Sequence, residues 1–149
     1  MSDADLVSLY SGRILALAAE IPHLGRLEAP QASVKRRSPL CGSTVTVDLD
    51  MESGRVARFA QDVKACALGQ AAAAVVGGAV LGANRFEIAR GRDELLAMLK
   101  SGGPAPQAPF DGLEVLLPAR DYKNRHASIM LALEATLEAV DQAEAAKSA

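Results

Sequence analysis

An alternating segment followed by a tight turn is the feature that most constrains how this chain can fold. From Thr44 to Asp50, valine or leucine alternates with threonine or aspartate at every position. An alternation of period two is typical of a strand that is buried on one face only. Ser53 and Gly54 are turn residues, and Arg55 to Ala60 then reads as a returning strand. The sequence therefore predicts an antiparallel hairpin over these residues.

The rest of the chain predicts one further strand and several helices. Apolar residues recur three and four positions apart, as they do on the buried side of a helix, and prolines and glycines separate the segments. The predicted elements are a helix from Asp3 to Ile21, a strand from Ala32 to Ser38, a helix from Cys66 to about Val76, a helix from Asn84 to Lys100 with a break at Gly91, a short helix from Phe110 to Leu117, and a final helix from about Asp121 to Gln142. This order predicts an α+β fold, with a small antiparallel three-stranded sheet packed against about five helices.

Length and charge narrow the class of protein. The 149 residues suffice for a single domain, in which we expect residues 1–4 and 143–149 to be frayed. A formal net charge of -2 argues against nucleic acid as a partner. The apolar stretch Ala67 to Ala83 is shorter than the roughly 20 residues of a membrane span. Asp3 and Asp5 do not fit the basic start of a signal peptide, so we expect a cytoplasmic protein without a membrane partner.

The two cysteines of the chain, Cys41 and Cys66, flank the predicted hairpin. Because the second strand returns toward the start of the first, the hairpin brings the two cysteines near each other. In a reducing compartment they are not expected to form a disulfide, and there is no CxxC motif of the kind found in oxidoreductases. The pair can therefore be either buried, inert thiols or ligands for a metal or for sulfur.

The residues around each cysteine favour a role as ligand. Cys41 follows Pro39 and precedes Gly42, a pattern typical of a tight turn in which glycine permits close backbone approach. Cys66 opens a predicted helix and comes shortly after Lys64. A helix N-terminus and a nearby cation both favour a thiolate.

A histidine on the final predicted helix is a third candidate. His126 lies in register with apolar residues at four-three-four-three spacing, which places it on the buried side of the helix. It is either a core histidine that bonds to a carbonyl or a metal ligand. Two thiolates and one imidazole suit zinc and iron. The neighbouring Lys123 and Arg125 either are solvated or stabilise anionic sulfur.

The order and spacing of these motifs resemble the NifU N-terminal, IscU and SufU family of iron–sulfur cluster assembly scaffolds. Leu40-Cys41-Gly42 before an alternating strand is similar to the family's first cysteine motif, and Cys66 at the start of a small-residue helix is similar to its second. The third family cysteine opens the last long helix, where this chain has Arg125-His126-Ala127-Ser128, with His126 standing in its place. The resemblance extends from about Leu6 to Val140.

The resemblance implies a scaffold or carrier rather than an enzyme. Such a protein receives sulfur from a cysteine desulfurase, builds a cluster, here expected to be 2Fe–2S, or holds iron, and passes it to recipient apoproteins. The implied ligands are Cys41, Cys66 and His126, with Ser43 or Asp62 as candidates for a fourth, and the implied supporting residues are Gly42, Lys64 and Arg125. Two alternatives stay open: a zinc-containing persulfide acceptor for the same desulfurase, and a metal-free member of the family that acts as an interaction module.

The chain departs from the family pattern at several positions. Ser43 stands where the family has an acidic residue, Val63-Lys64-Ala65 replaces a glycine-rich approach to the second cysteine, and Ala71 to Ala74 replaces a serine-bearing run. Separately, the basic run Lys35 to Arg37 either docks an acidic partner, such as the desulfurase, or protects an edge strand from aggregation.

Overall fold

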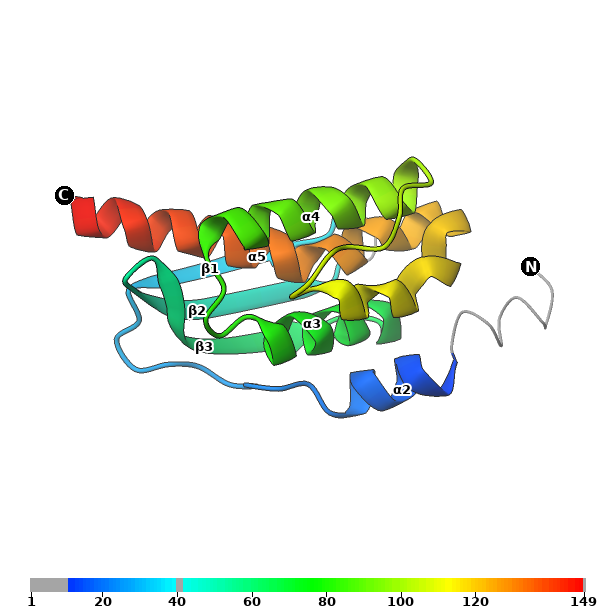
Figure 1. Cartoon of the computed structure of the whole chain (residues 1–149). Helices are drawn as coiled ribbons and strands as arrows, with labels where there is room; N and C mark the ends of the chain where they lie inside the picture. Colours follow the sequence, from blue (N-terminus) through cyan, green and yellow to red (C-terminus); the bar gives the residue numbers. More distant parts are fainter. Residues whose placement is uncertain (1–10, 40–41, 149) are drawn as a thin grey trace.

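The computed structural model describes residues 11–39 and 42–148, so Cys41 and the first part of the predicted N-terminal helix lie outside the described residues. Five helices and three strands make up the described part (Figure 1). In chain order they are α2 (Gly12–Ala19), β1 (Ala32–Arg37), β2 (Thr44–Glu52), β3 (Arg55–Lys64), α3 (Ala67–Ala79), α4 (Arg85–Lys100), the 3-10 helix η1 (Asp111–Asp121) and α5 (Lys123–Ser148). The predicted α+β class is confirmed.

The strands form one antiparallel sheet in the order β1-β2-β3. The predicted hairpin is confirmed, and both of its strands are longer than expected, so that Thr44 at the start of β2 pairs with Lys64 at the end of β3. Ser53 and Gly54 have φ angles of 53° and 76°. Two positive φ angles are what a two-residue hairpin loop needs to match the twist of its strands.

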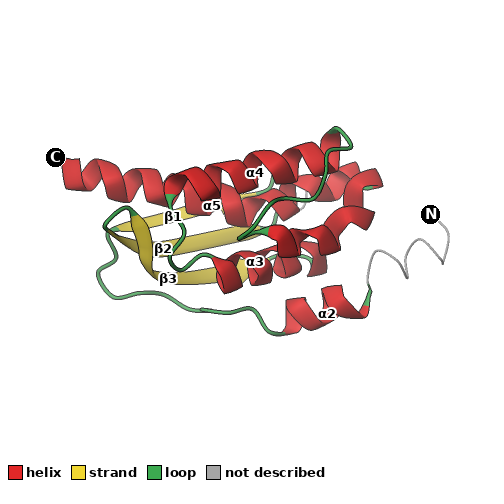
Figure 2. Ribbon diagram, viewed as in Figure 1, coloured by secondary structure: helices red, strands yellow, loops and turns green. Residues whose placement is uncertain are grey.

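The helices lie mainly on one face of the sheet (Figure 2). Helix α5 packs on β1 and β2, α3 packs beside it against β3, and α4 packs on α5 from outside. The inward side chains of β2 are fully or almost fully buried beneath α5, as the alternation predicts. The core that results contains Val47, Leu49, Leu68, Met98, Phe110, Ile129 and Leu133.

The opposite face of the sheet buries one charged residue. Asp48 on β2 has no solvent exposure. Its carboxylate accepts hydrogen bonds from Arg26 Nε at 2.7 Å, from Ser33 Oγ at 2.6 Å and from the Leu27 N–H at 3.1 Å. Burial works to raise the pKa of Asp48, but these hydrogen bonds and the charge of Arg26 outweigh it, and the pKa is lowered. These hydrogen bonds hold the segment before β1, which contains Arg26 and Leu27, against the sheet.

Helix α4 begins as predicted but does not break. Asn84 and Glu87 form a capping box, in which each side chain accepts from the other residue's N–H. The predicted break at Gly91 is wrong, because α4 is continuous to Lys100. A Cβ at Gly91 would lie 2.7 Å from Phe110 Cδ2. The glycine therefore makes room for the Phe110 ring rather than interrupting the helix.

The last two helices are longer than the sequence predicts. Helix η1 runs through Pro118, whose missing N–H disfavours an α-helix there, and ends at Asp121. Helix α5 continues past the predicted end at Gln142, because Ala143 is buried in the core and the Lys147 ammonium donates to the Met51 carbonyl.

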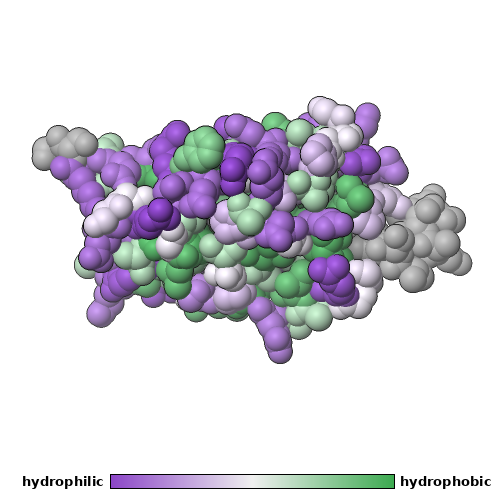
Figure 3. Space-filling view, in the orientation of Figure 1, coloured by the Kyte–Doolittle hydropathy of each residue, from purple (hydrophilic) through white to green (hydrophobic). Residues whose placement is uncertain are grey.

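The surface is mixed in character. In Figure 3, polar side chains alternate with smaller apolar areas over the face that is shown. No helix in residues 11–39 or 42–148 combines the length and apolar character that a membrane crossing needs.

Candidate functional site

Cys66 occupies the junction between β3 and α3. It is the N-cap residue of α3, with extended backbone angles, and its carbonyl accepts from the Gln70 N–H at 2.9 Å. Its side chain makes no capping hydrogen bond, and the residue is partly exposed. The predicted placement of this thiol at the start of a helix is therefore confirmed.

A serine from α5 contacts this thiol. Ser128 Oγ lies 3.6 Å from Cys66 Sγ and donates a hydrogen bond of 3.1 Å to Ser43 Oγ, at the start of β2. In the contact between Ser128 and Cys66, either the hydroxyl or the thiol can be the donor. Both serines are buried, at 1% and 4% exposure. One hydroxyl thus joins the start of α3, the start of β2 and helix α5.

Ser128 is the contact that sequence reasoning missed. It lies within the Arg125-to-Ser128 stretch, where attention fell on His126. The available signal was a small polar residue next to the apolar run that begins at Ile129, on a helix whose buried positions are mostly apolar.

Backbone hydrogen bonds join the described residues on either side of the predicted Cys41 turn. The Ser38 N–H donates to the Ser43 carbonyl at 2.8 Å, and the Gly42 N–H donates to the Ser38 carbonyl at 3.1 Å. Gly42 has a φ of 70°, a backbone angle that favours glycine. The predicted tight turn is confirmed for these residues.

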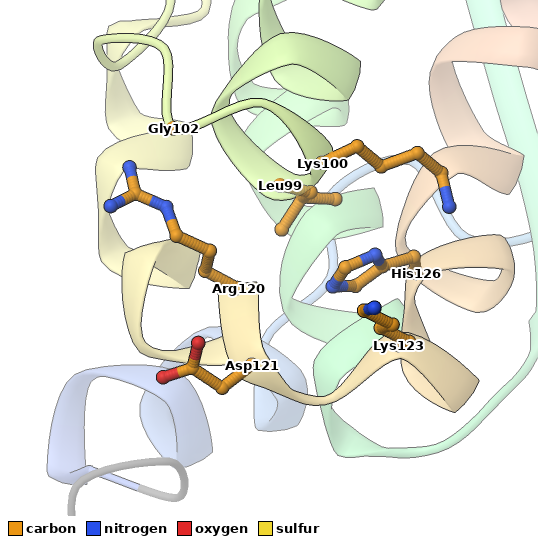
Figure 4. A pocket seen from close by; sticks show the side chains of 7 residues that line it. All are labelled: Leu99, Lys100, Gly102, Arg120, Asp121, Lys123 and His126. Carbon is orange, nitrogen blue, oxygen red and sulfur yellow. The ribbon is translucent and has the colours of Figure 1, made fainter.

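His126 faces inward, as predicted, with 2% exposure. Its Nε2 lies 2.9 Å from the Ala119 carbonyl oxygen, and its Nδ1 is buried without a hydrogen-bond partner among the described residues. The ring borders a cavity between the ends of α4 and η1 and the start of α5 (Figure 4). Residues two apart on a helix lie about 200° apart around its axis, so His126 and Ser128 face different sides of α5. Of these two residues, Ser128 is the one that contacts Cys66.

The remaining predicted residues lie at the same end of the sheet or on its other face. Asp62 pairs with Thr46, is exposed, and adds to the negative charge that raises the pKa of Arg26, after the hydrogen bond and charge of Asp48. By strand alternation Asp62 is on the face opposite to α5. Lys64 is exposed at the end of β3, and Arg125 is partly buried on the first turn of α5.

The described residues gather no group of three histidine, cysteine or carboxylate side chains that could hold a metal ion. Since Cys41 lies outside them, the ligand set Cys41, Cys66 and His126 stays a prediction, as do Ser43 and Asp62 as a fourth ligand. In the basic run of β1, Arg36 pairs with Glu138 at 3.4 Å and Glu134 at 3.9 Å on α5.

The fold described above, a three-stranded antiparallel sheet covered by helices, is shared with solved structures. The solved structure of a nitrogen-fixing NifU-like protein (N-terminal) from Brucella abortus matches with a TM-score of 0.92 and 43% sequence identity, over 95% of this chain and 98% of that one. This chain therefore belongs to the NifU-like N-terminal family, as the motif order predicted.

Two more distant structures share the fold. One is from Fervidobacterium islandicum AW-1 and is described as an iron–sulfur cluster assembly scaffold protein for the SUF system. It matches with a TM-score of 0.79 and 17% sequence identity, over 90% of this chain and 98% of that one. A hypothetical protein has a TM-score of 0.80 at 20% identity, over 91% of this chain and 98% of that one. No protein-family model matches the sequence, and neither does any curated protein.

Proposed function

We propose that this protein is an iron–sulfur cluster assembly scaffold or carrier, which holds iron or a cluster as cargo through Cys41, Cys66 and His126. Family membership and the description of the Fervidobacterium protein support this function. The observation that carries the proposal is the position of Cys66, partly exposed at the start of α3 and linked through Ser128 to Ser43.

Chain connectivity keeps Cys41 in the same neighbourhood. Cys41 precedes Ser43 by two residues, and consecutive Cα atoms are 3.8 Å apart, so the two Cα atoms are within about 7.6 Å of each other. Ser43 is in turn one hydrogen bond away from the serine that contacts Cys66. Two thiolates within reach of one cargo ion are what a scaffold site requires.

The hydrogen bonding of His126 is compatible with a metal ligand as well as with a core histidine. A carbonyl oxygen can only accept, so Nε2 carries a proton, and in the neutral ring Nδ1 keeps its lone pair. Metal-bound histidines commonly donate their other ring N–H to a carbonyl in this way. Ligation of a metal shared with Cys66 would require the first turn of α5 to shift, because His126 faces another side of that helix from Ser128.

The hydroxyls around Cys66 have a consequence for how firmly the cargo is held. Ser43 is uncharged at the position where the family resemblance implies an acid, and Ser128 presents oxygen rather than sulfur. Fewer anionic ligands give weaker binding of a cationic metal. A fourth ligand from water, an exogenous thiol or a partner completes the set, and we expect the cargo to transfer readily to a recipient apoprotein.

Anaerobic reconstitution with iron and sulfide tests the proposal. The protein should acquire visible absorption with two irons per chain for a 2Fe–2S cluster or less for a cluster shared between chains, and Cys66→Ala and Cys41→Ala should each lose it. Lys35→Ala, an exposed change on β1, is the control and should keep it. A colourless, iron-free product from the unaltered protein would contradict the proposal.

A second candidate is a zinc-containing persulfide acceptor for a cysteine desulfurase. The partly exposed position of Cys66, with its sulfur 3.6 Å from the Ser128 hydroxyl, favours it. Here the measurement is elemental analysis of the purified protein together with desulfurase turnover. Stoichiometric zinc and faster turnover support the acceptor, whereas absence of both removes it; the metal-free interaction module is left only if iron reconstitution also fails. The desulfurase, the recipients and the cytoplasmic location stay predictions.

A further inference from the structure

Strand β1 forms one edge of the sheet, and its outer side carries hydrogen-bonding groups that the sheet does not use. Within the described part of the chain, β1 pairs with β2 alone, in antiparallel register. The Ser38 N–H donates to the Ser43 carbonyl, and bonded pairs alternate with non-bonded pairs along an antiparallel ladder. The N–H and carbonyl groups of Lys35 and Arg37 are therefore directed away from β2. No hydrogen bond among the described residues reaches them.

The side chains along this edge are basic on the face opposite to α5. Because strand side chains alternate and Val34 is buried in the core, Lys35 and Arg37 share the opposite face. Both are exposed, and neither is in a salt bridge with a described residue. Arg36, between them, faces the helices and pairs with two acids of α5. The two cations without a described partner thus lie on one face, two positions apart.

A groove lies beside this edge on the helix side. It has a volume of about 250 Å³ and is lined by Arg36 of β1, Arg92 of α4, and Glu134, Leu137, Glu138 and Asp141 of α5. The helix layer therefore extends past β1 toward α4 (Figure 2). Leu137 is partly buried against the core and gives the groove an apolar contact. A strand added beside β1 would have this groove beneath it.

We propose that β1 binds an extended acidic segment of a partner protein, which joins the sheet as an added antiparallel strand. Two acids directly opposite Lys35 and Arg37 form cross-strand pairs of opposite charge, which stabilise a sheet. The residues between those acids face the groove, where Glu134 and Glu138 disfavour a further acid and Leu137 accepts an apolar side chain. A second copy of this chain does not fit, because its own β1 would place like charges opposite each other.

Arg37 connects this edge with the cysteine site. Its Nη2 lies 3.8 Å from the position that a Cβ at Gly42 would take, and Gly42 follows Cys41. A partner held along β1 therefore lies next to the Cys41 turn. Binding of the segment does not depend on the proposed function, whereas the transfer of cargo to or from that partner rests on it.

Short peptides test the proposal. Fluorescence anisotropy of a labelled peptide in which glutamate alternates with valine should show saturable binding to the full chain, and hydrogen exchange at the Lys35 and Arg37 N–H groups should slow. N-methylation of the glutamates should weaken binding at least about tenfold, because antiparallel pairing directs their N–H groups at β1. N-methylation of the valines, whose N–H groups point away, is the matched control and should leave the affinity within about twofold.

Charge reversal tests the two side chains. The double variant Lys35→Glu with Arg37→Glu should bind the glutamate peptide at least about tenfold more weakly and should bind the corresponding lysine peptide instead. Arg13→Glu with Lys100→Glu changes the net charge equally, at exposed residues of α2 and α4, and should leave binding of the glutamate peptide unchanged.

Three results would overturn the proposal: no saturable binding of the glutamate peptide, equal affinity for the two N-methylated peptides, or equal affinity of the unaltered protein and the β1 double variant. The first two comparisons need no variant of the protein. The two proposals fail separately, because the β1 double variant should still acquire the cluster from iron and sulfide, whereas Cys66→Ala should lose the cluster and still bind the peptide.

Discussion

Ser128 Oγ lies 3.6 Å from Cys66 Sγ, so α5 presents an oxygen to the thiol at the start of α3. In the resembling family a third cysteine lies at the beginning of the last long helix, and we expected His126 to take its role. The contact identifies Ser128 as the α5 side chain that faces Cys66.

Ser128→Cys should therefore strengthen cargo binding. A thiol at this position would add a third sulfur beside Cys66, and thiolates hold iron and zinc more strongly than hydroxyls do. We expect reconstituted iron to resist removal by a chelator at least about tenfold longer, equivalent to about 1.4 kcal/mol. Ser101→Cys adds a thiol at an exposed residue after α4 and is the matched control. Equal chelator resistance in both variants would contradict the assignment of Ser128 to the site.

The role of His126 as a ligand has its own spectroscopic test. Cobalt(II) in place of the native metal gives bands that report on the ligand set, and thiolate ligands give intense charge-transfer bands. His126→Ala should keep the charge-transfer bands of the two cysteines and shift the ligand-field bands, since one nitrogen ligand is lost. Identical ligand-field bands before and after the substitution would show that His126 does not bind the metal.

Close packing of α3 on α5 supports the cysteine site. A Cβ at Gly69 would lie 2.5 Å from Ser128 Oγ and 2.9 Å from Ala65 Cβ. Gly69→Ala should lower the free energy of unfolding by about 1–3 kcal/mol through overpacking. Gly78→Ala is the control on the same helix: nothing lies within 4 Å of its Cβ, and alanine should stabilise the helix by up to about 1 kcal/mol. Urea denaturation measures both, and a stabilised Gly69→Ala protein would contradict the packing argument.

The buried carboxylate of Asp48 makes the free energy of unfolding depend on pH in the acidic range. Because its pKa is lowered in the folded protein, its contribution is present above the unfolded value of about 3.9 and is lost as the pH falls through the folded value. Asp48→Asn should cost about 2 kcal/mol of unfolding free energy at pH 7, and the difference should shrink below about pH 4.

Asp141→Asn is the control for Asp48. Asp141 pairs with Arg85 at 2.6 Å, a bond as short as those of Asp48, but both side chains are about half exposed. Exposed pairs contribute about 0–1 kcal/mol. Chemical denaturation at several pH values should show a large effect for Asp48 alone, and equal effects for the two substitutions would be inconsistent with burial as the cause.

The sequence predicted correctly those features that are set by residue spacing or turn residues within a single segment. The hairpin, the capping box at Asn84 and the inward face of His126 all follow from spacing within one segment, and the structure confirms them. The position of Cys66 followed from the small-residue helix after the second strand.

Features that depend on contacts between distant segments were not predictable in this way. Gly91 read as a helix break because its packing against Phe110 involves a residue from another element. The Ser128 contact with Cys66 spans 62 positions. Asp48 read as a solvent-facing strand residue, because nothing local indicates that Arg26 and Leu27 cover it.

Helix α5 contacts the β2 segment near both of its ends: Ser128 donates to Ser43, the residue before the strand, and Lys147 donates to Met51, the residue before its end. From Ser128 to Lys147 the helix rises about 28 Å at 1.5 Å per residue, and from Ser43 to Met51 the strand spans about 27 Å at 3.4 Å per residue. The two elements therefore have nearly the same length. A one-residue insertion in either would displace one of the two contacts while the other stayed in place. The distance between the hairpin tip and the cysteine site is therefore fixed by two elements of matched length. An insertion or deletion in one element would have to be compensated in the other to keep both contacts.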